Sequence, residues 1–121
     1  GLLMTSPIKK SIPRVRARVL HILLAAPVTG LSAGQLARQL HMSESTLRRR
    51  LREEKTSYRQ LLEEVRRYRC DQALDNPRIG GKVLAAQLGF QQTNSFYRAF
   101  TRWTGIPWRE YKRECGRAQP V

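Results

Sequence analysis

In this sequence LARQLHM (residues 36–42) returns as LAAQLGF (residues 84–90), an offset of 48 residues. Each copy is followed by a segment with helical spacing, STLRRRL at residues 45–51 and NSFYRAF at residues 94–100. A small alanine shortly before a tight turn leaves room for a second helix to cross the first. That second helix then needs an apolar inner face and a polar, cationic outer face. The repeat therefore predicts two helix-turn-helix motifs, which suggests two reading heads on one DNA face.

The composition indicates a polyanionic partner. The chain has 121 residues, enough for one compact domain or two very small ones that share a core. Its 23 Lys and Arg residues against 9 Asp and Glu residues give a formal net charge of +14, and a polyanion relieves such self-repulsion most naturally. Arginine outnumbers lysine, which favours bidentate binding of phosphate and guanine over diffuse attraction to a membrane. A hydrophobic content of 40%, arranged periodically, argues against a disordered basic tail.

Other classes of function lack their sequence signatures here. Cys70 and Cys115 lie far apart without a CxxC or Cys–His spacing, so we expect no metal site, no cofactor and no disulfide framework. No stretch approaches about 18 apolar residues and no signal-peptide pattern is present, so we expect no membrane span and a cytoplasmic location. Because P-loop, GxSxG and HExxH motifs are absent, we expect no enzymatic activity. Glu53-Glu54 and Glu63-Glu64 are interpreted as charge balance for neighbouring arginines.

Periodicity and capping residues predict an all-α fold of about seven helices, with two helix-turn-helix subdomains joined by a long linker helix. Pro13 suits the first position of the first helix. Ser32 and Gln35 form a capping box for the second helix, and Ser43 suits the N-cap of the third.

The second half of the chain starts with the linker helix. Ser57, with Gln60 three residues later, opens this helix of about 17 residues. Its apolar set is Leu61, Leu62, Val65, Tyr68, Ala73 and Leu74. Further helices are expected at 82–88, 92–103 and 108–114, with Gly89 in the second turn, Gly105 as a C-terminal cap and Pro107 at the first position of the last helix. The predicted boundaries are a tail at 1–11, a first subdomain at 12–56, the connecting helix at 57–76, a second subdomain at 77–115 and a tail at 116–121.

Three spaced motifs in the second half resemble a known family. They are Leu84-Ala85-x-x-Leu88-Gly89-Phe90, Phe96-x-Arg98-x-Phe100 and Gly105-Ile106-Pro107-x-x-x-Tyr111, and together they resemble the C-terminal signature of bacterial AraC/XylS transcription regulators. The resemblance covers roughly residues 15–114, and the run at 51–66 is similar to the branch that contains the OruR and VqsM types of pseudomonad regulators.

The resemblance implies a function and partners. The recognition helices, residues 43–52 and 92–103, would enter adjacent major grooves of promoter DNA about one helical turn (~34 Å, ~10 bp) apart. Recruitment or occlusion of RNA polymerase would follow. In this family an effector-binding and dimerisation part normally precedes this domain, so the resemblance implies that such a part is missing from this chain.

The resemblance also implies which side chains face DNA. Matching the base-facing positions of the family gives Ser45, Arg48 and Arg49 in the first recognition helix and Thr93, Asn94 and Arg98 in the second. Arginine can bind guanine bidentately, asparagine can bind adenine, and threonine can touch a thymine methyl. The residues expected at phosphates are Ser43, Thr46, Arg50, Arg52, Gln92 and Tyr97.

Alternatives stand beside these assignments. The arginines at 48–50 can be a solvated cationic face, and Thr93 and Asn94 can simply cap the second recognition helix while Arg98 pairs with an acidic neighbour. A non-specific nucleic-acid architectural protein, or a membrane-surface or protein-interaction module, would share the charge. The aromatic residues could stack single-stranded bases, but their helical spacing favours a core: Phe90, Phe96, Phe100, Trp103, Trp108 and Tyr111.

Three positions depart from the family pattern. His41 stands where the first turn often has glycine, so we expect a mildly strained or left-handed turn residue there. Gln91 stands where the second recognition helix often has a serine or aspartate cap, which predicts a weak cap. Gly81 replaces a common acidic residue near the start of the preceding helix.

Overall fold

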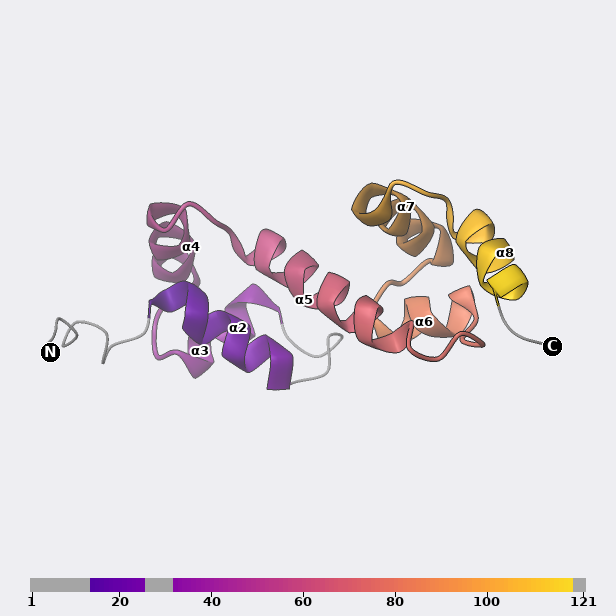
Figure 1. Ribbon diagram of the computed structural model, residues 1–121. Helices are drawn as coiled ribbons and strands as arrows, with labels where there is room; N and C mark the ends of the chain where they lie inside the picture. The colour runs from indigo at the N-terminus through magenta and orange to yellow at the C-terminus, as the bar shows by residue number, and fades with distance from the viewer. Residues whose placement is uncertain (1–13, 26–31, 119–121) are drawn as a thin grey trace, which may run out of the picture. The chain divides into compact units, whose positions relative to one another are not determined.

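The computed structural model describes residues 14–25 and 32–118, and every regular element in these ranges is a helix (Figure 1). The predicted tail at 1–11, the predicted helix start at Pro13 and the last three residues lie outside the described residues. The seven helices are α2 (Val15–Ala25), α3 (Ala33–Gln39), α4 (Glu44–Glu53), α5 (Tyr58–Ala73), α6 (Gly81–Gln87), α7 (Thr93–Thr104) and α8 (Trp108–Ala118). The predicted all-α class is confirmed. The chain divides into two compact units, residues 1–65 and residues 66–121.

The first unit holds α2, α3, α4 and the beginning of α5 around one aliphatic core. Val19, Leu36, Leu47, Leu51 and Leu61 are fully buried in it. Within each helix the buried residues recur every three or four positions, so one stripe of each helix is removed from water. Burial of each such side chain contributes about 1.5–3 kcal/mol to folding, which makes this cluster the main source of the stability of the unit.

A half-buried carboxylate joins two helices of the same unit. Glu54 accepts hydrogen bonds from the backbone N–H groups of Val15, at 3.0 Å, and Arg16, at 2.9 Å. These N–H groups belong to the first turn of α2 and have no partner within the helix, and a negative charge is favourable there. The interpretation of Glu54 as charge balance for neighbouring arginines was therefore wrong, because its carboxylate caps another helix. Glu64 does pair with a cation, Arg16, at 3.3 Å.

The turn of the first motif has a defined hydrogen-bond pattern. The N–H of Met42 donates to the carbonyl of Ala37, at 3.0 Å, and the N–H of His41 donates to the carbonyl of Arg38, at 3.1 Å. This pair of bonds is a Schellman motif, which needs a left-handed residue after the helix, and His41 has φ 61°. The predicted left-handed turn at His41 is confirmed. Met42 then packs against the core and fixes the direction in which the chain enters α4.

The second unit repeats this turn around an aromatic core. The N–H of Phe90 donates to the carbonyl of Ala85, at 3.0 Å, and the N–H of Gly89, which has φ 85°, donates to Ala86. The core contains Cys70, Leu84, Leu88, Phe96, Phe100 and Trp108, with Phe90 packed against it. Phe96 and Phe100 are fully buried. The aromatic residues therefore lie in or against the core that their spacing predicts.

One member of the predicted apolar set of the linker helix was wrong. Tyr68 is 55% exposed, whereas Cys70, two residues later, is 2% exposed and belongs to the core of the second unit. The predicted set did not distinguish residues that face different cores. The helix instead gives Leu61 and Val65 to the first core and Cys70 to the second.

Burial sets the chemistry of two groups in the second core. It raises the pKa of the Cys70 thiol to about 11, with a smaller contribution from the charge of Asp71. Burial, followed by a hydrogen bond with Cys115, raises the pKa of Tyr111 to about 12. Both groups are protonated at pH 7 already at their ordinary pKa values of 9.0 and 10.0, and burial extends the pH range over which they stay neutral.

Several predicted helix ends were wrong by a few residues. The N-cap of α7 is Gln92 and not Gln91, and its side chain makes no capping hydrogen bond. Pro107 is the N-cap of α8 and not its first helical residue, because its carbonyl accepts the hydrogen bond from the Tyr111 N–H at 3.0 Å. That helix also continues to Ala118, beyond the predicted end at residue 114.

Candidate nucleic-acid interface

The helix α4 separates its residues into a buried and a charged face. Leu47 and Leu51 are fully buried. Ser45, Arg48 and Arg49, the three predicted base-facing residues, are all exposed. Successive residues of a helix are turned by about 100°, so a leucine pair on the inner face directs the residues between them outward. The structure thus brings the three predicted side chains to the open part of one helix.

The predicted phosphate contacts of α4 differ in their freedom to move. Arg50 and Arg52 are exposed. Ser43 is the N-cap, and its hydroxyl accepts from the Thr46 N–H at 3.1 Å and donates to the Thr46 hydroxyl at 2.9 Å. A serine cap of this kind stabilises a helix by about 1 kcal/mol. Ser43 and Thr46 therefore already act in fixing the first turn of α4.

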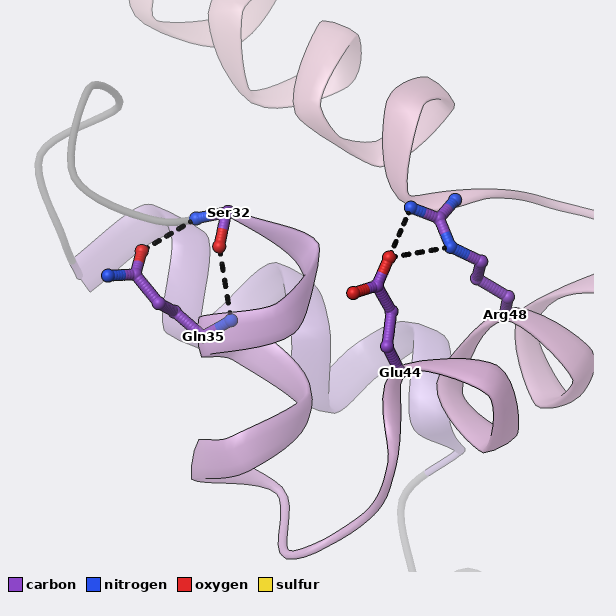
Figure 2. A network of polar contacts seen from close by, with 4 residues as sticks. All are labelled: Ser32, Gln35, Glu44 and Arg48. Atoms are coloured by element: carbon purple, nitrogen blue, oxygen red, sulfur yellow. Dashed lines mark hydrogen bonds and ion pairs between the residues drawn. The ribbon is translucent and has the colours of Figure 1, made fainter.

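One of the predicted base readers has a partner that the sequence analysis did not consider. Nε and Nη2 of Arg48 donate to the same oxygen of Glu44, at 3.0 and 2.7 Å (Figure 2). The two residues are four apart in one helix, where opposite charges meet readily, so the spacing alone signals the pair. Both side chains stay about half exposed.

The second recognition helix, α7, is also two-sided. Phe96, Ala99 and Phe100 are buried, while Asn94 and Arg98 are exposed, and Thr93 is half-buried. Thr93 is the first residue of the helix and follows the N-cap, so the alternative that Thr93 caps α7 was wrong.

The two other predicted phosphate contacts lie at the start of α7 and on its inner side. Gln92 is exposed and leaves the first turn of the helix without a side-chain cap. Tyr97 is half-buried, and its ring stacks on Trp108 with planes 19° apart.

Arg66 holds the turn that leads into α7. Its Nε donates to the carbonyl of Leu88, at 2.9 Å, and its Nη2 donates to that of Gly89, at 3.1 Å. Its guanidinium lies 4.4 Å from the centre of the Phe90 ring. The carbonyls of the C-cap residue Leu88 and of Gly89, together with the ring of Phe90, are thus held against α5 by one side chain. Arg66 was not predicted as a functional residue, since nothing in the local sequence distinguishes it from the other arginines of α5.

A lysine and a glycine fix the packing of α6 in the same unit. Nζ of Lys112 donates to the carbonyls of Pro77, at 2.7 Å, and Ile79, at 2.9 Å. Gly81 packs so tightly that an added Cβ would lie 2.6 Å from the hydroxyl of Tyr97 and 2.8 Å from Nε1 of Trp108. The glycine in place of an acidic residue therefore has a steric reason in this chain.

Residues 14–25 and 32–118 contain no group of three or more His, Cys, Asp or Glu side chains that could hold a metal ion. No helix in this part of the chain is long and apolar enough to span a bilayer.

Known proteins share this arrangement. A family model described as a helix-turn-helix domain matches residues 36–114. The ornithine utilization regulator of Pseudomonas aeruginosa is 40% identical over 88 residues, which are 73% of this chain and 26% of that protein. The regulator VqsM of the same species is 40% identical over 76 residues, 63% of this chain and 23% of that protein. The chain thus spans about a quarter of the length of these relatives.

A solved structure matches almost from end to end. It is that of a DNA-binding transcriptional dual regulator from Escherichia coli K-12, with a TM-score of 0.78 and 30% identity. The match covers 88% of this chain and 96% of the other. The family resemblance and its branch, both predicted from the motifs, are confirmed by these similarities. The chain belongs to the AraC/XylS family of regulators, and residues 36–114 match its helix-turn-helix domain.

Proposed function

We propose that this chain binds double-stranded promoter DNA sequence-specifically and thereby controls transcription. In this proposal α4 and α7 are recognition helices that enter adjacent major grooves, about one helical turn apart. The observation that carries the proposal is the repeated turn: in each unit the same two backbone hydrogen bonds precede a helix with a buried inner face and a polar outer face. A protein that only gripped phosphates would have no need of two such motifs.

The first recognition helix, α4, has the more charged set of assigned base-contacting residues. We assign base contacts to Ser45, Arg48 and Arg49, with Arg49 bound to a guanine. A bidentate arginine–guanine pair discriminates against a wrong base by about 1–3 kcal/mol. The exposed positions of all three residues support this assignment.

The second recognition helix, α7, is less charged. We assign base contacts to Thr93, Asn94 and Arg98, which lie in the first half of α7. Asn94 and Arg98 are four residues apart and therefore share a face of the helix. An asparagine that binds adenine and a threonine that touches a thymine methyl would make this head prefer A·T-containing steps.

Phosphate contacts would supply much of the affinity. We assign them to Ser43, Thr46, Arg50, Arg52, Gln92 and Tyr97. The uncapped first turn of α7 supports the place of Gln92, because free N–H groups at a helix start attract phosphate oxygens. Binding would then weaken steeply as salt rises.

The remaining parts of the proposal concern the whole regulator. The aligned residues make up only about a quarter of each relative, which supports an effector-binding and dimerisation part elsewhere in the protein. Bound at a promoter in the bacterial cytoplasm, the protein would recruit or exclude RNA polymerase. We propose no catalytic role, in keeping with relatives that are transcription regulators.

Selection from a random duplex pool at about 0.15 M salt tests the proposal. We expect a motif with two informative blocks about one helical turn apart. Arg49→Ala should relax one block only, whereas Arg113→Ala, an equal loss of charge at an exposed position of α8, should leave the motif unchanged. A single block would mean that one helix reads and the other only holds phosphate. Retention of DNA without any enriched sequence would refute the proposal in favour of an architectural protein.

A further inference from the structure

Glu44 is an acidic residue within the cationic segment that we assign to DNA. It lies in the first turn of α4, next to Ser45, one of the assigned base readers. A carboxylate near DNA phosphates costs affinity, because like charges repel and a carboxylate can only accept hydrogen bonds. The start of α4 offsets part of this cost, because a negative charge is favourable there, and the bonds to Arg48 are a second contribution.

The carboxylate of Glu44 is bonded to Arg48 and lies close to Gly34 of α3. One carboxylate oxygen, Oε2, accepts both hydrogen bonds from Arg48. The other, Oε1, lies 3.2 Å from the point where a Cβ on Gly34 would stand. Figure 2 shows the pair beside the capping box of Ser32 and Gln35 at the start of α3. The absence of a side chain at Gly34 thus leaves room for Glu44 against α3.

The two bonds occupy a particular edge of Arg48. A guanidinium group has two edges that can donate in parallel, one formed by Nε and Nη2 and one formed by Nη1 and Nη2. Glu44 takes the first edge. The second edge points along the end of the side chain, and it is the edge that an arginine uses to meet O6 and N7 of a guanine head-on.

We propose that Glu44 is a positioning residue for base recognition. It holds the side edge of Arg48 so that the end edge meets a guanine, and it keeps Arg48 away from the nearest phosphate. Glu44 therefore exchanges general affinity for selectivity at one base pair. This inference rests on the proposed function, since it needs α4 in the major groove.

The test compares matched losses of one negative charge on α4. Glu44→Gln removes the ion pair, and Glu53→Gln removes an exposed carboxylate from the last turn of the same helix. Binding is measured to the selected duplex and to duplexes in which each G·C pair of the α4 block is replaced by A·T. Both variants should bind non-cognate DNA more tightly and with a steeper salt dependence.

Only Glu44→Gln should lose selectivity. An arginine–guanine pair discriminates about five- to 150-fold, and we expect at least a fivefold loss at one G·C position. Because Glu44 acts through Arg48, the same change should have no further effect on selectivity in an Arg48→Ala background. If Glu44 had only a structural role, Glu44→Gln would lower the thermal stability and would weaken binding to every duplex by the same factor.

The outcomes separate this inference from the proposed function. If the wild-type chain shows no preferred sequence, both fail. If the wild-type chain is selective and Glu44→Gln retains its full selectivity, or Glu53→Gln loses as much, the role of Glu44 is refuted while the proposed function stands. An additive effect of the two changes in the double variant would also refute it, because Glu44 would then act independently of Arg48.

Discussion

Replacing Gly81 by alanine should destabilise the second unit, although the same replacement usually favours a helix. Gly81 is the first residue of α6. An added Cβ would lie 2.6 and 2.7 Å from two atoms of Tyr97 and 2.8 Å from Nε1 of Trp108. Carbon atoms in contact lie about 3.5–4.0 Å apart, so both rings would have to retreat by roughly 1 Å.

The rings have little room to retreat. Tyr97 stacks on Trp108, and Trp108 meets Phe100 edge-on with centroids 5.0 Å apart. Overpacking of this kind costs about 1–3 kcal/mol, while exchange of glycine for alanine in a helix returns about 0.5–1 kcal/mol. The expected result for Gly81→Ala is a net loss of about 1–2 kcal/mol in the free energy of unfolding.

Gly116 provides a matched control in the same unit. It lies inside α8, and a Cβ there would meet nothing within 4 Å. Gly116→Ala should therefore stabilise the unit by about 0.5–1 kcal/mol. Urea titration followed by tryptophan fluorescence is the suitable assay, because the two tryptophans of the chain, Trp103 and Trp108, both report on this unit.

The sign of the difference decides the matter. If Gly81→Ala is as stable as the wild type or more stable, the aromatic packing over α6 is looser than described. If Gly116→Ala destabilises as much as Gly81→Ala, the loss comes from glycine replacement in general and the steric explanation is refuted.

Three other predictions concern the turns and the core. Arg66→Met keeps the apolar stem but removes the bonds to the turn, so it should lower the free energy of unfolding by about 1–3 kcal/mol. In a selection experiment it should also weaken the sequence preference at the block read by α7 more than at the block read by α4. Equal weakening of both blocks would contradict this. His41→Gly should raise the stability of the first unit by up to about 1 kcal/mol, and Gly89→Ala should lower that of the second by a similar amount, because both positions have positive φ. Melting curves followed by circular dichroism should therefore show a higher melting temperature for His41→Gly and a lower one for Gly89→Ala. The pKa of Cys70 rises from 9.0 to about 11 on folding, so between these pH values the folded chain keeps a proton that the unfolded chain has lost. The contribution of Cys70 to the free energy of unfolding is therefore complete below pH 9 and falls by about 1.4 kcal/mol per pH unit as the pH rises from 9 to 11. Urea midpoints measured over this range should fall less steeply for Cys70→Ala than for the wild type.

Local sequence features predicted the helices and turns because their causes are local. The Schellman turn at His41 and the cap at Ser43 each involve groups within five residues of each other along the chain. Apolar spacing likewise reports which side of a helix faces inward. The repeat could therefore reveal both motifs before any tertiary contact was known.

Contacts between distant residues were beyond that reasoning. Glu54 caps a helix 39 residues earlier, Arg66 reaches 22 residues ahead, and Lys112 reaches back 35 residues. Each joins a charged side chain to backbone atoms, and a backbone group carries no signature in the sequence. From periodicity alone, such residues are therefore predicted to be charged surface residues.

The candidate site was predictable in its exposure and less so in its contacts. The helical spacing of Leu47 and Leu51 was enough to direct Arg48 and Arg49 outward. The pairing of Arg48 with Glu44 follows from a four-residue spacing, and it changes which edge of the guanidinium is available. The assignment of individual bases stays a prediction, since it depends on the DNA itself.

The membership of α5 in two cores has a consequence for folding cooperativity. This helix has 16 residues, and its first half supplies Leu61 and Val65 to one core while its second half supplies Cys70 to the other. A helix of roughly half that length hardly forms alone in water, because nucleation is costly and propagation repays it slowly. Whichever unit folds first therefore nucleates a helix that the other can extend. Stability is in this sense shared along the chain, and two separated halves would be less stable in sum than the intact molecule.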